Sequence, residues 1–251
     1  MQAVLYVAHG SRVKAGVEEA VQFIETVKPH IDVDIQEICF LELAKPSILE
    51  GVAACIDRGA TNIAVIPILL LTANHAKQDI PQEINKAKQL YPFVTFSFGK
   101  PFGIHEKLIN SLHDRVLEKS TSLSEETDIL LIGRGSSDPC VHADFQQIAN
   151  YLKRKYNYAN VDICFLYGKG PSFESALNQL NIEQKNQTYI IPYILFTGLL
   201  KIGIQKKIAQ HSFLQNKVVL CECLGYDENV RQVLIERVNQ VLIVKGEVCN
   251  G

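Results

Sequence analysis

The sequence lacks the features that would place it in a membrane, secreted or nucleic-acid-binding class. Its longest apolar run, from Ile63 to Ala73, is interrupted by Pro67 and is too short to cross a bilayer. No basic segment precedes the apolar run at the start of the chain, so no secretion signal is expected. The net charge of -2 at pH 7 provides no basic field for nucleic acid. We therefore expect a soluble cytoplasmic protein that binds neither membranes nor nucleic acid.

Paired cysteines and nucleotide-binding motifs are also absent from the sequence. The seven cysteines are an odd number without a C-x-x-C pair, which is typical of reduced thiols in a cytosolic protein. Cys221 and Cys223 would point to the same face of a strand, where core packing is favoured over a two-thiolate metal site. Because no G-x-G-x-x-G or Walker lysine pattern occurs, no nucleotide cofactor is expected.

The chain contains an internal repeat whose two copies differ at the chemically reactive positions. When the sequence is shifted by 125 positions, many residues between Leu5 and Thr72 align with identical residues of the second copy, and no gap is needed. Three positions carry imidazole, carboxylate and imidazole in the first copy and none of these groups in the second. The facing pairs are His9 with Arg134, Glu42 with Tyr167, and His75 with Leu200. A duplicated scaffold has therefore kept one reactive site and lost the other.

Short apolar runs alternate with amphipathic helical segments along the chain. The runs are rich in Val, Ile, Leu and Phe and show little alternation, which is typical of parallel strands buried on both faces. The predicted strands are Ala3–Ala8, Val33–Leu41, Asn62–Leu71, Val94–Phe98, Ile129–Ile132, Val161–Phe165, Tyr189–Phe196 and Lys217–Cys221. Repeated βα units place helices on both sides of such sheets.

The predicted fold class is therefore α/β, with two similar parallel-sheet domains that arise from the duplication. The chain has 251 residues, 47% of them hydrophobic, which is enough for two domains of about 125 residues each. The polar stretch 119–127, KSTSLSEET, is the predicted boundary. Residues 1–120 are expected to form an N-terminal domain with the catalytic residues. Residues 128–251 are expected to form a degenerate repeat, the other wall of an active-site cleft.

Three polar residues follow the first three predicted strands: His9, Glu42 and His75. The carboxyl ends of parallel strands meet at one edge of a sheet, where ligands bind in α/β proteins. Two imidazoles and a carboxylate are common ligands of divalent metals and leave coordination positions open. A single histidine such as His9 could instead satisfy a backbone group, but three matched positions favour a metal site. The apolar neighbours Leu41 and Leu43 argue that the Glu42 carboxylate is not merely solvated.

The equivalent edge of the second copy carries Arg134, for which two interpretations remain open. Its guanidinium could bind substrate carboxylates, or it could form an ion pair with Asp138 that braces the turn. The turn Gly10-Ser11 weakly resembles an anion-binding turn. Alanine precedes His9, so the Arg-His-Gly triplet of histidine phosphatases is missing and phosphate-ester hydrolysis is disfavoured. The other histidines are expected to be solvated: His30, His105, His113, His142 and His211.

Five segments carry a resemblance to a known family. The first half contains V-A-H-G-S-R, C-F-L-E-L-A-K-P-S and P-I-L-L-L-T-A-N-H-A-K-Q-D-I-P, and the second half contains I-G-R-G-S-S-D-P and I-P-Y-I-L-F-T-G. Together they resemble the sirohydrochlorin chelatase family, over nearly the whole chain until about Lys201. The resemblance implies a two-domain α/β chelatase fold related to the anaerobic cobalt chelatases and to ferrochelatase.

The resemblance also implies an activity, the insertion of a divalent metal into sirohydrochlorin without ATP. The family's two histidines map onto His9 and His75, and its acidic partner maps onto Glu42, so these residues are the expected metal ligands and catalytic groups. The metal is a substrate, Fe²⁺ for siroheme with Co²⁺ or Ni²⁺ as alternatives, and no permanent cofactor is expected. The chain ends V-K-G-E-V-C-N-G, without the histidine-rich stretch or iron–sulfur cysteine cluster of some cobalt-specific relatives, which favours iron.

The residue types suit this chemistry independently of the resemblance. Insertion removes two pyrrole protons, and neutral imidazoles can both hold a metal weakly and accept protons near neutral pH. Sirohydrochlorin has eight carboxylates, which basic and hydroxyl groups can bind. The expected substrate-binding residues are Ser11, Arg12, Asn74 and Arg134. We expect a monomer with sirohydrochlorin and a divalent metal as its partners; the alternative is a non-catalytic two-domain protein that binds a metal or a tetrapyrrole.

Overall fold

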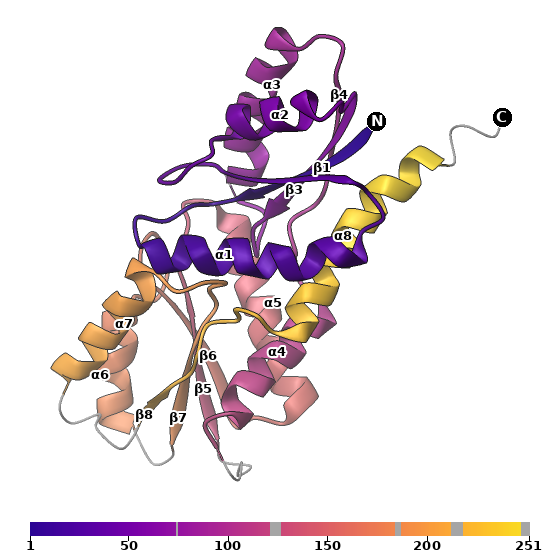
Figure 1. Cartoon of the computed structure of the whole chain (residues 1–251). Coiled ribbons are helices and arrows are strands. Elements are labelled where there is room, and N and C mark those ends of the chain that lie inside the picture. Colours follow the sequence, from indigo (N-terminus) through magenta and orange to yellow (C-terminus); the bar gives the residue numbers. More distant parts are fainter. Residues whose placement is uncertain (74, 121–126, 184–186, 212–217, 247–251) are drawn as a thin grey trace. The chain divides into compact units, whose positions relative to one another are not determined.

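The computed structural model describes residues 1–73, 75–120, 127–183, 187–211 and 218–246. Contacts divide the chain into two units; the first is Met1–Gly103 with Arg231–Gly251, and the second is Ile104–Val230. Within the described residues, each unit contains one parallel sheet of four strands covered by helices (Figure 1). The predicted α/β class with two similar parallel-sheet domains is confirmed.

The first sheet has the strand order β2-β1-β3-β4, with every neighbouring pair parallel. Its strands are β1 (Gln2–Ala8), β2 (Ile35–Phe40), β3 (Asn62–Ile68) and β4 (Thr95–Phe98). The last residue of β1, Ala8, pairs with Phe40 on one side and with Ile68 on the other. The chain thus leaves β1 toward β2 and then crosses back to β3, so the end of β1 is the point at which ligands bind in such sheets.

Helices cover both faces of this sheet because its side chains alternate between two apolar faces. Leu5 and Val7 pack in one cluster with residues of α2 and α3. The other face includes Tyr6, whose pKa is raised by burial and by Glu25 of α1. The helices assigned to this unit are α1 (Lys14–Val27), the short 3₁₀ helix η1 (Lys28–His30), α2 (Ile48–Asp57), the π-helix η2 (His75–Asp79) and α3 (Ile80–Leu90).

The second sheet repeats this plan with the order β6-β5-β7-β8. Leu130 and Ile132 of its central strand pack with Phe173, Leu177 and Ile204 from two helices on one face. The strands are β5 (Asp128–Gly133), β6 (Asn160–Phe165), β7 (Thr188–Pro192) and β8 (Val218–Leu220). The helices are α4 (Glu106–Leu117), α5 (Pro139–Tyr156), α6 (Phe173–Glu183), α7 (Leu199–Gln210) and α8 (Glu228–Gly246), the last of which also enters the first unit.

Strands β3 and β7 are shorter than the apolar runs Asn62–Leu71 and Tyr189–Phe196 that predicted them. The chain leaves the ladder after Ile68, and the carbonyls of Leu69 and Leu70 accept hydrogen bonds from the backbone N–H groups of Phe102 and Gly103. Leu69 and Leu70 are therefore held by a connecting segment rather than by another strand.

The domain boundaries differ from the predicted 1–120 and 128–251. Helix α4 packs against α5 and β7 and belongs to the second unit, whereas α8 from Arg231 onward belongs to the first. Arg237 of α8 donates hydrogen bonds to the carbonyls of Pro101 (3.1 Å) and Phe102 (2.6 Å). Each repeat therefore contributes its last helix to the other unit. Most of the predicted boundary segment, residues 121–126, lies outside the described residues.

Helix α2 begins at Ile48, two residues after Pro46. Ser47 caps the helix because its Oγ accepts a hydrogen bond from the Glu50 N–H, while the Glu50 carboxylate accepts one from the Ser47 N–H (2.6 Å). These bonds lower the pKa of Glu50 to about 2. Gly59, just beyond the helix, has φ +91°, which glycine adopts without strain.

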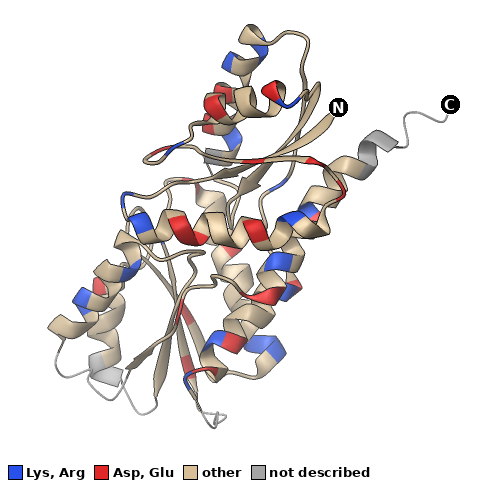
Figure 2. Cartoon of the chain, in the orientation of Figure 1, with Lys and Arg blue, Asp and Glu red and all other residues tan. Residues whose placement is uncertain are grey.

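Charged side chains lie mostly on the helices and loops, and the central strands carry few of them (Figure 2). Strands β1 and β3 contain none, as expected for strands buried on both faces. No helix in the described part of the chain is long and apolar enough to cross a membrane.

Candidate functional site

The edge of the first sheet brings His9 and Glu42 together, as the sequence predicted. His9 directly follows β1, and Glu42 lies two residues beyond β2. The ladder between the two segments continues past the strands, because the Leu41 N–H donates to the Ala8 carbonyl (2.9 Å) and the Glu42 N–H donates to the His9 carbonyl (3.1 Å). Backbone hydrogen bonds, rather than loop packing alone, therefore fix the two side chains as neighbours.

The side chains of His9 and Glu42 face each other, with Nε2 and Oε1 3.3 Å apart. The other ring nitrogen, Nδ1, lies 3.1 Å from the Gly10 carbonyl oxygen. Both ring nitrogens therefore face an acceptor oxygen, so a neutral ring donates its proton to one of them and presents a lone pair to the other. The exposed fractions of the two side chains are 27% and 46%, so both are open to an incoming ligand.

Glycine is required at position 10 because the Glu42 backbone lies directly against it. Gly10 has φ +95°, and a Cβ there would lie 1.8 Å from the Glu42 carbonyl oxygen. The second copy keeps the same arrangement, since Gly135 has φ +92° and its Cβ would lie 1.8 Å from the Tyr167 carbonyl oxygen. Tyr167 N–H also donates to the Arg134 carbonyl (3.0 Å). The two copies thus share one backbone frame and differ in the side chains that it carries.

His75 begins the π-helix η2, in the segment that follows β3. π-helical turns are rare and are found frequently at functional sites. Strand β3 is the neighbour of β1 on the side opposite β2. His75 therefore follows the third of the three strands after which the predicted metal ligands were expected. The described part of the chain includes the backbone of His75 but not its side chain, and the predicted substrate-binding residue Asn74 lies outside it. Among the described side chains, no group of three metal-binding residues occurs.

The Glu42 carboxylate contacts His9, in agreement with the prediction that it is not merely solvated, but neither Glu42 nor its neighbour Leu43 is buried. Leu43 is 48% exposed, and Glu42 itself is an exposed residue. The physical reason is the turn after β2, where Leu43 adopts φ 63°, in the left-handed region. The carboxylate is therefore positioned by His9 and by its own backbone rather than by burial. The left-handed backbone of Leu43 was not predicted, although the repeat pairs this residue with a glycine, Gly168, which signals such a backbone.

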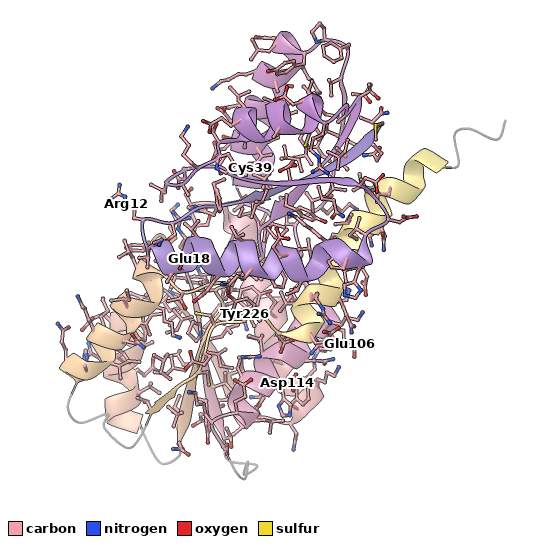
Figure 3. The ribbon with its side chains drawn as sticks, in the orientation of Figure 1. Arg12, Glu18, Cys39, Glu106, Asp114 and Tyr226 are labelled. Atoms are coloured by element: carbon pink, nitrogen blue, oxygen red, sulfur yellow. The ribbon has the colours of Figure 1, made fainter. Side chains whose placement is uncertain are left out.

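Two of the predicted substrate-binding residues lie in the loop between β1 and α1. The Ser11 Oγ accepts a hydrogen bond from the Val13 N–H (3.0 Å), as the Ser136 Oγ does from Asp138 in the second copy (3.0 Å). The exposed side chain of Arg12 extends outward from this loop (Figure 3). Ser11 therefore shapes the turn beside His9, and Arg12 provides a positive charge near it.

Arg134 occupies the position equivalent to His9, at the end of β5. It is exposed, as is Tyr167, the residue equivalent to Glu42, with 65% of its surface accessible. The Asp138 carboxylate accepts a hydrogen bond from the Cys140 N–H (3.0 Å) and caps α5. Leu200, which faces His75 in the repeat, lies in α7.

Several histidines that were predicted to be solvated are engaged in packing or hydrogen bonds. His113 stacks on Tyr156 with ring centroids 3.6 Å apart and lies 2.8 Å from the Tyr158 hydroxyl. Burial lowers its pKa. His142 lies 2.8 Å from the Lys169 carbonyl, and His105 accepts a hydrogen bond from the Lys107 N–H. The sequence could not show these partners because each ring contacts groups distant in the chain or caps a helix.

Cys221 and Cys223 follow β8 and are both buried. Burial raises the pKa of Cys221 to about 12, so its thiol stays protonated at neutral pH. A protonated, buried thiol packs as a small apolar group. This agrees with core packing rather than with a two-thiolate site.

Comparisons with known proteins show the family to which the chain belongs. Residues 3–119 and 128–241 match the model of the CbiX family. A sirohydrochlorin ferrochelatase of Priestia megaterium is 44% identical over 246 residues, covering 98% of this chain and 92% of that protein. A sirohydrochlorin cobaltochelatase of the same organism is 34% identical, covering 99% and 82%. The structure of SirB from Bacillus subtilis with Fe³⁺ has a TM-score of 0.88 at 41% identity, covering 98% and 97%.

Proposed function

The chain belongs to the CbiX family, and on that premise we propose that it is a sirohydrochlorin ferrochelatase. It inserts Fe²⁺ into sirohydrochlorin to form siroheme, and it does so without ATP. The observation that carries this function is the pair of His9 and Glu42 at the edge of the first sheet, in a chain that is 44% identical to a protein of that activity.

The distance between His9 Nε2 and Glu42 Oε1 suits two neighbouring ligands of one metal ion. Metal–nitrogen and metal–oxygen bonds of about 2.1 Å at a right angle place the two ligand atoms about 3 Å apart. The observed separation is 3.3 Å. A lone pair on Nε2 and a carboxylate repel each other unless a cation or a proton lies between them. The pair can therefore hold the incoming metal and, after the metal leaves, a proton.

His75 completes the proposed metal site as the second imidazole. It begins η2 in the segment that follows β3, and β3 is the neighbour of β1 on the side opposite β2, which supports one site shared by the three proposed ligands. A set of nitrogen and oxygen ligands binds the metal less tightly than a closed thiolate site does, so the ion can pass to the macrocycle. Cys39, the cysteine of β2, is buried, and its raised pKa keeps the thiol protonated.

The same groups accept the two protons that leave the pyrrole nitrogens. An imidazole with an ordinary pKa near 6.5 can accept a proton at neutral pH and release it to solvent. Glu42 balances the charge of the dication and, being exposed, can pass protons outward. We propose His9 and His75 as ligands and proton acceptors, with Glu42 as third ligand or proton relay.

In our proposal, hydroxyl, amide and guanidinium groups from the two copies bind the carboxylates of the macrocycle. Arg12 and Ser11 lie in the loop that follows His9, and Asn74 precedes His75 in the sequence. Arg134 supplies a guanidinium from the second copy; it can pair with a carboxylate through two hydrogen bonds, and as a cation it does not bind the metal. Because one chain supplies every proposed group, a monomer suffices. We also propose that the protein is cytoplasmic, which is supported by its described cysteines, because they are free thiols as is usual in that compartment.

Iron is the proposed physiological metal, with Co²⁺ insertion for cobalamin precursors as the alternative. The sirohydrochlorin cobaltochelatase relative is 34% identical, against 44% for the ferrochelatase. The test is to follow the absorption spectrum of sirohydrochlorin under anaerobic conditions with Fe²⁺, Co²⁺ or Ni²⁺. We expect repeated turnover with the highest kcat/KM for Fe²⁺. A higher kcat/KM for Co²⁺ would support the alternative, and a stoichiometric spectral change without turnover would indicate a binding protein.

A further inference from the structure

Leu43, the residue after Glu42, has a backbone conformation that is unfavourable for leucine. Its φ of 63° lies in the left-handed region, where the Cβ of an L-residue approaches the following carbonyl oxygen. Its side chain is also 48% exposed, so it gains only part of the stabilisation that a buried leucine provides. The fold alone therefore does not account for leucine at this position.

The turn itself requires the left-handed conformation in both copies. Position 168, equivalent to 43 in the repeat, is a glycine with φ +82°. In both copies the preceding residue presses its carbonyl against a glycine after the first strand of the sheet, Glu42 against Gly10 and Tyr167 against Gly135. Glycine is the unstrained solution, and the copy without a reactive pair uses it.

The two copies also differ in the space above this turn. A Cβ on Gly168 would lie 2.9 Å from the Ser136 carbonyl oxygen, so the second copy has no room for a side chain. The first copy keeps the side chain of Leu43, half exposed and adjacent in sequence to Glu42. A strained residue beside reactive groups is characteristic of positions that contact ligands.

We propose that Leu43 is a positioning residue that packs against the apolar face of the flat tetrapyrrole while Glu42 and His9 act at the ring centre. This inference rests on the proposed function. Sirohydrochlorin has its carboxylates at the periphery and an apolar conjugated ring in the middle, so arginines and hydroxyl groups suit its rim but not its face. An exposed leucine next to Glu42 in the sequence would supply the missing apolar contact and set the height of the ring above the metal.

The size of the effect follows from the exposed half of the side chain. Complete burial of a leucine side chain changes an affinity by roughly one to two factors of ten. About half of that surface is available for contact with the ring, so loss of the side chain should raise the Kd for sirohydrochlorin about three- to tenfold. The KM for the metal should not change, because leucine provides no ligand atom.

The experiment uses two variants that keep the turn and remove the apolar side chain, Leu43→Gly and Leu43→Asn. Glycine and asparagine both tolerate the left-handed conformation. Leu43→Met restores an apolar side chain and should recover most of the affinity. Leu90→Asn is the matched control, because Leu90 is 62% exposed at the end of α3. The measurements are the Kd for metal-free sirohydrochlorin from absorption titration, the KM values for tetrapyrrole and metal, and urea unfolding.

We expect a higher Kd for sirohydrochlorin and a higher tetrapyrrole KM in the glycine and asparagine variants. The urea midpoint of Leu43→Gly should not be lower than that of the wild type. Unchanged tetrapyrrole binding in both variants, while the wild type inserts metal, would overturn this inference and leave the proposed function intact. A loss that also appears in Leu90→Asn would overturn it as well. If the wild type neither binds nor metallates sirohydrochlorin, the proposed function fails, and the role of Leu43 fails with it.

Discussion

A methyl group added at Gly10 should disable the site by moving Glu42. In Gly10→Ala the new Cβ would lie 1.8 Å from the Glu42 carbonyl oxygen, so the segment after β2 must move away from β1. The movement separates the two side chains that now lie 3.3 Å apart. A displacement of about 1 Å in a reacting group can lower a rate on the order of 100-fold. We expect a loss of that size in kcat for metal insertion.

The same substitution in the second copy is a closely matched control. Gly135→Ala meets the Tyr167 carbonyl at the same 1.8 Å, and φ is +92° there against +95° at Gly10. A left-handed backbone costs an L-residue about 1–2 kcal/mol, and relief of the close contact adds to this. Both variants should therefore lose about 2–4 kcal/mol of unfolding free energy in the unit concerned, which urea denaturation measures.

The two variants should differ in catalysis and not in stability. Gly135→Ala leaves His9 and Glu42 in place, so its kcat should stay near the wild-type value even if the KM for sirohydrochlorin rises. Insertion is followed by absorbance at temperatures where both variants are folded. Equal losses of kcat in the two variants would refute the assignment of the reactive site to the first copy. A wild-type kcat in Gly10→Ala would show that the contact between Gly10 and Glu42 does not position the carboxylate.

Four further predictions test individual side chains. His75→Ala should abolish insertion without unfolding the protein, as judged by circular dichroism; a wild-type rate would remove it from the metal site. Glu42→Gln should lower both the rate and the metal affinity, and an unchanged rate at limiting metal would leave Glu42 a structural role only. Arg134→Ala should raise the KM for the tetrapyrrole much more than that for the metal, since a guanidinium pairs with a carboxylate and does not bind a metal cation; the reverse pattern would contradict its assignment. Ser47→Ala should cost about 1 kcal/mol in urea unfolding at pH 7 without affecting kcat, because the Glu50 N–H loses the Ser47 Oγ as its acceptor; an unchanged unfolding free energy would exclude Ser47 as the cap.

The sheets and half of the site could be predicted because the sequence repeats their determinants. Buried parallel strands require continuous apolar runs, and the constant shift of 125 positions showed that each half contains the same units. His9 and Glu42 follow adjacent strands, and the end of a parallel strand fixes where the next residues emerge. That rule places the two residues at one edge of the sheet, where their side chains lie 3.3 Å apart.

The exchange of α4 and α8 could not be predicted from the repeat. Both helices have an apolar face of the usual spacing, and nothing in that pattern says which sheet each face covers. The assignment of α8 to the first unit is seen only in the structure, where Arg237 donates hydrogen bonds to Pro101 and Phe102, residues distant in sequence. The exposure of Glu42 could not be predicted from the sequence for a related reason. Apolar neighbours indicate burial in a strand, but Leu43 is in a left-handed turn and projects toward solvent.

The most direct test of the account is the number of siroheme molecules that one enzyme molecule forms from Fe²⁺ and sirohydrochlorin under anaerobic conditions. The wild type and His9→Ala are compared at equal concentration, with tetrapyrrole in excess and the absorption spectrum as the readout. We expect the wild type to complete many turnovers at a rate above that of the uncatalysed reaction, and His9→Ala to complete none. An uncatalysed rate in the wild type, or equal turnover in both proteins, would contradict the account.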